Sequence, residues 1–218
     1  FEGPIDVELK DAPEGFTLGG GTIPAGRERV HMTLAMPDKG AGQLLRLHFV
    51  ARAKDGRRKW ERPVTPADNV MQAFLWRHLV PAQETQALVR GARSGLPRIT
   101  LAEKKPARLS CGGKAAVRFA VAGRTDLRVQ DYEFVLVDPP VGISLGRVRV
   151  SGDGFSLQLR ADRTAKREKH ADNLLVEILR KPGAPKKAKK RRRGKKNQAP
   201  QRRGTPVGLL PAIPYYVP

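Results

Sequence analysis

The chain has 218 residues, and its 42 Lys and Arg outweigh its 21 Asp and Glu to give a formal net charge of +21. Its 22 Gly and 18 Pro residues are too many for a mostly helical protein and too few for a wholly disordered one. A single Cys excludes an intramolecular disulfide framework and a Cys-rich zinc module. No apolar run approaches the ~18 residues that a membrane-spanning helix needs.

Most of the chain alternates apolar and polar residues, which is the pattern of half-buried β-strands. The alternation predicts strands at 4–9, 30–36, 45–53, 115–121, 146–150 and 155–159. Turn residues such as Asp55-Gly56 and Gly152-Asp153-Gly154 separate these stretches. Short strands at this spacing predict an all-β fold made of antiparallel sandwiches or barrels.

One stretch predicts a helix instead of a strand. Thr65 can cap a helix, Pro66 suits its first position, and Asp68 stands at its third position. Apolar residues then recur every three or four positions as far as Pro81, so we expect a short helix near 66–79. The alternative is that only the first turn is helical and that 74–79 forms a strand.

The positive charge is concentrated in one segment. Residues 180–203 contain 13 Lys and Arg and no acidic residue, which leaves a net charge of +8 for the remaining 194 residues. Such a segment repels itself and offers little apolar surface to bury, so we expect it to be disordered. Apolar residues return after it, which predicts a loop inserted between a strand at 173–179 and a last strand at 207–217.

A Gly-rich stretch at 91–97 suits a domain boundary. We therefore predict one domain at 1–93 that includes the short helix, and a second domain at 97–218 that carries the basic loop at 180–204. The chain begins with Phe1 and not with Met, which we interpret as a cleaved product or a piece of a longer chain.

Three stretches resemble a known family of modules. GGGTIPAGRERVHMTLAM at 19–36, RPVTPADNVMQAFLWRHLVPAQE at 62–84 and the closing VGLLPAIPYYVP resemble tandem bacterial immunoglobulin-like modules. Such modules lie near the C-termini of large secreted or cell-surface proteins, often after pre-peptidase C-terminal domains. The resemblance implies two tandem immunoglobulin-like β-sandwiches, a non-catalytic accessory role, and an extracellular, periplasmic or cell-surface location. The basic insert departs from the family's pattern.

The sequence offers no constellation of residues that supports catalysis. His31 and His48 fall on polar positions of their strands, His78 continues an apolar face where we expect it half-buried, and no two His have the spacing of a metal site. Cys111 is more typical of a small apolar filler than of a reactive thiol. Gly112-Gly113-Lys114 lacks the other residues of a phosphate-binding loop. We predict neither an enzyme nor a cofactor, and no small-molecule substrate.

The basic segment is the one strong functional feature of the sequence. We expect the chain to act as a structural spacer or adhesion-like accessory module that contacts other domains of a longer parent chain. The alternative is a module that binds anionic polymers without sequence specificity: nucleic acid, anionic polysaccharide or a membrane surface. The residues predicted to carry that binding are Lys186, Lys187, Lys189, Lys190, Arg191, Arg192, Arg193, Lys195, Lys196, Arg202 and Arg203.

Overall fold

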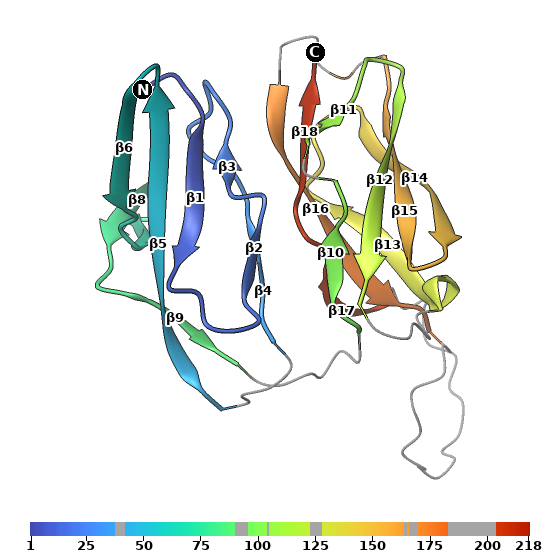
Figure 1. Cartoon of the computed structure of the whole chain (residues 1–218), viewed down its shortest axis with the longest axis horizontal. Coiled ribbons are helices and arrows are strands. Elements are labelled where there is room, and N and C mark those ends of the chain that lie inside the picture. The colour runs from blue at the N-terminus through green and yellow to red at the C-terminus, as the bar shows by residue number, and fades with distance from the viewer. Residues whose placement is uncertain are drawn as a thin grey trace. The chain divides into compact units, whose positions relative to one another are not determined.

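A computed structural model describes residues 1–37, 42–89, 96–103, 105–122, 128–163, 165, 170–182 and 204–218. The described chain is all-β, as the alternation predicted, with one short 3-10 turn (Figure 1). Within these residues no helix is long and apolar enough to cross a membrane. The chain divides into two compact units. Unit 1 comprises Phe1–Arg93 with Ala171–Asn173, and unit 2 comprises Ser94–His170 with Leu174–Pro218.

Unit 1 is built on one sheet with the strand order β3-β1-β5-β6, and β9 pairs with the other end of the long strand β5. The strands β2 and β4 pair with each other, and so do β7 and β8. The bounds are β1 Ile5–Lys10, β2 Thr17–Gly19, β3 Thr22–Ile23, β4 Thr33–Ala35, β5 Leu44–Asp55, β6 Arg58–Pro63, β7 Ala67–Gln72, β8 Trp76–Pro81 and β9 Thr85–Leu88.

The core of unit 1 is small. Its buried cluster consists of Phe16, Leu47 and Val89 among the residues described, with partly buried neighbours from β1, β4, β5 and β9. From Leu45 to Phe49 of β5 every second side chain turns inward, which places Leu47 and Phe49 on the core side and His48 in solvent. The strand β6 is exposed along its whole length, so it adds pairing to the sheet but little burial.

The helix predicted near 66–79 is wrong, because these residues form the hairpin β7–β8. Pro66, which suggested a helix start, instead accepts a backbone hydrogen bond at 2.8 Å from Ala82 at the base of the hairpin. Three residues connect Gln72 to its partner Trp76, and the first two of them, Ala73 and Phe74, turn the chain with positive φ angles of 49° and 62°. The alternative is right in part: β8 forms most of the strand expected at 74–79, but the helical first turn is absent, since Ala67–Gln72 is also a strand.

Unit 2 contains two sheets. One has the order β10-β12-β15-β14; the other has the order β11-β18-β16-β13, with β17 also paired to β16. The bounds are β10 Ile99–Leu101, β11 Ala107–Arg108, β12 Lys114–Val121, the 3-10 turn η1 Val129–Asp131, β13 Tyr132–Val137, β14 Ile143–Ser151, β15 Gly154–Ala161, β16 His170–Arg180, β17 Thr205–Leu209 and β18 Ile213–Val217.

Both sheets of unit 2 supply side chains to one core. Of the residues that the structure describes in this unit, eighteen are buried in this cluster. The ring of Phe155 on β15 stacks 5.3 Å from Phe119 on β12 and lies 5.3 Å from Phe134 on β13, which belongs to the other sheet. Leu157 and Leu159 continue the inward face of β15 with exposed fractions of 1% and 0%. Along these strands, side chains therefore point alternately into the core and toward solvent.

The predicted return of the chain after the basic segment is confirmed. Thr205 of β17 pairs with Arg180 of β16, and β18 lies between β11 and β16. Leu210, Ile213 and Tyr215 are at most 1% exposed. The end of the chain is therefore part of the core of unit 2.

Candidate functional site

Residues 183–203 of the basic segment lie outside the described residues, and so do all of its predicted site residues from Lys186 to Arg203. The structure does place its two flanks. Arg180 and Thr205 face each other on adjacent antiparallel strands. On the incoming side the backbone N–H of Lys181 donates to the carbonyl of Asp131 at 2.9 Å, and its Nζ donates to the carbonyl of Gln130 at 2.9 Å. The segment therefore leaves and re-enters unit 2 at one place.

Unit 2 also presents a set of ordered cations that sequence patterning did not predict. On β12, Val117 and Phe119 are buried, so Lys114 and Arg118 point to solvent. On β15, Phe155, Leu157 and Leu159 are buried, so Arg160 points outward. On β14, Arg149 pairs with the outward Ser156. We call the four residues Lys114, Arg118, Arg149 and Arg160 the cationic sheet face.

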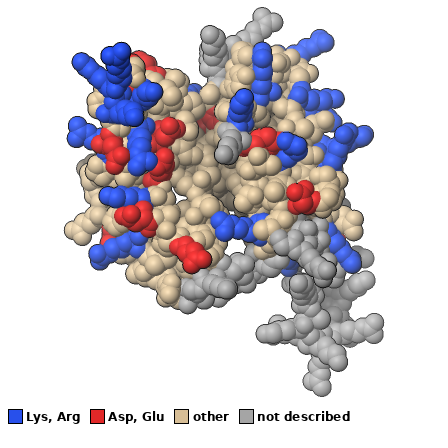
Figure 2. All heavy atoms as spheres, in the orientation of Figure 1, with Lys and Arg blue, Asp and Glu red and all other residues tan. Residues whose placement is uncertain are grey.

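The register brings two of these cations together. Lys114 stands directly opposite Arg160, and the next strand places Ser144 on the other side of Arg160. Side chains at directly opposed positions are about 5 Å apart at Cβ, where like charges destabilise a sheet. In Figure 2 the blue Lys and Arg side chains line the side of unit 2 on which β14 lies. The sheet thus brings like charges close together, although their repulsion makes the folded state less stable.

Among the described residues, Glu103 is the acidic residue that forms an ion pair with this face. Glu103 accepts hydrogen bonds from Arg118 Nε at 2.7 Å and from the Arg118 backbone N–H at 2.8 Å. The hydrogen bond and the charge of Glu103, with a smaller contribution from Asp153, raise the pKa of Arg118 above its usual value. Among the described residues no ion pair forms with Lys114, Arg149 or Arg160. Three of the four cations are therefore available to an external anion.

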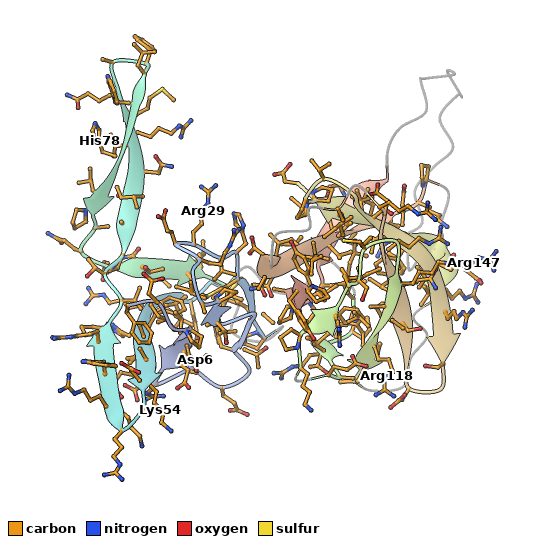
Figure 3. The ribbon with its side chains drawn as sticks, turned by 90° about the horizontal axis from the view of Figure 1, so that it is seen from above. Asp6, Arg29, Lys54, His78, Arg118 and Arg147 are labelled. Atoms are coloured by element: carbon orange, nitrogen blue, oxygen red, sulfur yellow. The ribbon has the colours of Figure 1, made fainter. Side chains whose placement is uncertain are left out.

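A bulge in β14 shapes the face. The register shifts between Leu145 and Val148, so that Gly146 and Arg147 have no partners in β15. A Cβ at Gly146 would lie 2.7 Å from Gln158 Oε1 and 2.8 Å from Arg160 Nε. Glycine therefore leaves room for these two polar groups, which are themselves joined by a hydrogen bond at 3.2 Å. Figure 3 shows Arg147 and Arg118 extending from unit 2 toward solvent.

The other residues considered for chemistry stay apart. His31 and His48 are exposed, as predicted, and His78 is also exposed, although we expected it to be half-buried. Cys111 is exposed and not a core filler, and its Sγ lies 3.4 Å from the carbonyl of Ala165. In the part of the chain that the structure describes, no three His, Cys, Asp or Glu side chains gather as metal ligands.

Comparison with known proteins adds no relative from which a function could be transferred. No protein-family model, no curated protein and no solved structure matches this chain significantly. The cationic sheet face is therefore the candidate site. Its signal in the sequence was the basic residues at outward positions of the stretches KAAVRFAV, GRVRV and SLQLR. We had treated these stretches only as core strands.

Proposed function

We propose that this chain is a non-catalytic accessory module of an exported bacterial protein, adhesion-like or a spacer, whose units are immunoglobulin-like sandwiches. The resemblance of three stretches to such modules supports this. The all-β fold of the described residues and the single core shared by the two sheets of unit 2 are consistent with it. Within that role, we propose that unit 2 binds anionic polysaccharide.

The observation that carries the binding proposal is the opposition of Lys114 and Arg160 on the cationic sheet face. A like-charged pair costs stability in the free protein, and a bound anion would relieve that cost. The basic segment, with 13 cations in 24 residues, enters and leaves the same unit. It would add electrostatic attraction for an anionic polymer without adding a defined binding surface. An ordered set of cations and a densely charged segment in the same unit suit a long, evenly charged polymer.

The residue types of this face favour a polysaccharide over nucleic acid. Proteins that bind single-stranded nucleic acid without sequence preference usually stack its bases on exposed aromatic rings. The aromatic residues of β12 and β15 are Phe119 and Phe155, which are 2% and 1% exposed and turned into the core. The outward side offers Ser156, Gln158 and the cations. Such groups donate hydrogen bonds to carboxylate or sulfate groups.

The test is retention on heparin-agarose across a salt gradient. The first variant joins Lys114→Gln, Arg149→Gln and Arg160→Gln. The control joins Arg57→Gln, Arg58→Gln and Lys59→Gln, which removes the same charge from exposed positions of unit 1. We expect the first variant to elute at clearly lower salt than the control, and deletion of 183–203 to lower the elution salt further.

Two results would contradict the binding proposal. Equal shifts in the two triple variants would mean that retention follows total charge and not the cationic sheet face. Stronger binding to a single-stranded oligonucleotide than to a sulfated polysaccharide at equal salt would assign the face to nucleic acid. If neither polymer binds the intact chain, the spacer role is the one that remains.

A further inference from the structure

The hairpin β7–β8 is the most exposed element of unit 1. All twelve residues of its two strands are exposed, and each strand pairs only with the other. Figure 3 shows the hairpin extending away from the sheet of unit 1, with His78 on one of its strands. An isolated two-stranded hairpin is marginally stable in water. In the working protein, the surroundings of the hairpin should therefore supply the stabilising contacts that unit 1 does not provide.

The hairpin exposes large apolar side chains that proteins normally cover. The exposed fractions are 94% for Phe74, 84% for Leu75, 67% for Trp76 and 74% for Leu79. Val70, Met71 and Val80 are also about half exposed. Scattered exposed apolar residues are common, whereas a contiguous group of this kind marks an interaction site.

The register shows which kind of partner fits this group. Trp76 lies opposite Gln72, and Val70 lies opposite His78, on one face of the hairpin. Met71 and Leu79 lie on the other face, because successive side chains alternate. With the tip included, apolar side chains point in three directions. A flat protein surface covers only one of these directions, whereas a lipid bilayer surrounds an inserted tip on all sides.

The charges and the backbone define how deep such insertion goes. The outer edges of β7 and β8 carry unpaired peptide groups, which cannot enter hydrocarbon. One hydrogen bond closes the turn at the tip, from the Leu75 N–H to the Gln72 carbonyl at 3.3 Å. Arg77 is the charged residue nearest the tip, and Asp68, the acidic residue of the hairpin, lies toward its base. The tip thus suits the interfacial layer, where Trp is enriched and a cation meets lipid phosphate.

We propose that the tip of the β7–β8 hairpin inserts into the interfacial layer of an anionic lipid bilayer. Phe74, Leu75 and Trp76 enter the layer, and Arg77 contacts the lipid phosphates. The high net charge of +21 draws the chain to an anionic surface, and the tip then anchors it. This contact uses unit 1 and is independent of the polysaccharide site proposed on unit 2.

Fluorescence of Trp76 tests the proposal directly, because the chain has only two Trp residues. A Trp60→Phe background, in which the new ring can keep the edge contact with Phe1, leaves Trp76 as the sole reporter. Vesicles of equal parts phosphatidylglycerol and phosphatidylcholine are titrated into the full chain. We expect the emission of Trp76 to shift to the blue and to be quenched by brominated lipid. Vesicles of phosphatidylcholine alone should give a weaker response.

A double variant separates insertion from charge attraction. In the same background, Phe74→Ser with Leu75→Ser should weaken vesicle binding by at least about tenfold, because two large apolar groups no longer leave water. The control is Val141→Ser, an apolar residue of unit 2 that is 78% exposed and lies outside the hairpin. An unchanged thermal melt in both variants would show that each protein is folded.

Three results would overturn the proposal. The first is vesicle binding without a blue shift of Trp76, which would assign the contact to the cations alone. The second is equal binding by the double variant and by Val141→Ser. The third is a dimer in sedimentation without lipid that the double variant abolishes, which would make a second copy of this chain the partner of the hairpin. If the intact chain showed no retention on heparin but Trp76 still shifted to the blue with vesicles, the polysaccharide site would be contradicted and this inference would stand.

Discussion

The two units bury very different amounts of apolar surface. In unit 2 eighteen residues from both sheets form one buried cluster, whereas the cluster of unit 1 contains three among the residues described. Large exposed apolar residues show the opposite distribution, since Phe74, Leu75 and Leu79 of unit 1 are at least 74% exposed. Strands with similar alternating patterns can thus form either a well-filled core or a sheet whose apolar side chains stay largely exposed. What decides the outcome is whether a second sheet closes over the first.

Unit 1 compensates in part with charges across its strands. Arg52 on β5 lies directly opposite Glu61 on β6, with 3.0 Å between Arg52 Nε and Glu61 Oε2. The same guanidinium also pairs with Glu8 on β1. Arg52 donates hydrogen bonds to Glu61 and Glu8, and these bonds together with the two negative charges raise the pKa of Arg52 above its usual value. Such exposed pairs stabilise a fold far less than buried apolar side chains do, so we expect unit 1 to unfold before unit 2.

The largest effect should follow removal of residues 205–218. This truncation takes Leu210, Ile213 and Tyr215 from the core of unit 2 and removes β18 from between β11 and β16. Calorimetry should then show only the transition of unit 1. Deletion of 183–203 is the matched control, and it should leave both transitions nearly in place because loop closure depends weakly on length. A normal second transition in the truncated chain would contradict the role assigned to β17 and β18.

A large effect should also follow truncation of a single core side chain. Leu157→Ala in unit 2 should lower the free energy of unfolding of that unit by about 2–5 kcal/mol, because the surrounding side chains of both sheets hold the cavity open. Leu47→Ala in unit 1 should cost about 2 kcal/mol, since a small core collapses more readily into the space. Urea unfolding of each variant measures the two costs. Equal costs would mean that the cores are equally rigid.

These two substitutions show what could be read from sequence. Both Leu residues lie on the inward side of strands that alternation predicted, because period-2 patterning is a local property. The difference between their surroundings depends on which strands become neighbours, and that is decided by contacts far apart in the chain. The opposition of Lys114 and Arg160 was hidden for the same reason. The hairpin β7–β8 was missed because its apolar residues occur in adjacent groups three to four positions apart, which matches a helical spacing and not alternation.

A smaller but more local effect is expected at Gly154 in unit 2. A Cβ built there would lie 1.9 Å from the backbone oxygen of Phe119, which belongs to the neighbouring strand β12. Gly154→Ala should push β12 and β15 apart and cost about 1–3 kcal/mol, the range of overpacking in a filled core. Gly208→Ala is the control, because its Cβ would meet only Leu96 Cδ1, at 3.3 Å. Thermal melts that drop equally for both variants would argue against a close contact at Gly154.

The smallest effect should come from the charges of unit 1. Arg52→Gln removes the cation between Glu8 and Glu61, and it should lower the first transition slightly at low salt and hardly at all at high salt, because screening weakens exposed pairs. The pKa of Arg52 is higher in the folded protein than in the unfolded chain. The stability that the Arg52 ion pairs add is therefore fully present below the pKa of Arg52 in the unfolded chain, and it is lost only as the pH rises through the higher pKa of the folded protein. We therefore expect the effect of Arg52→Gln to be the same from neutral to moderately alkaline pH.

Arg147→Gln, an exposed cation of unit 2, is the control for the change in net charge. If Arg52→Gln lowered the first transition as far as Leu47→Ala, charges and not apolar burial would hold unit 1 together, and the two units would differ in the kind of force as well as in its amount.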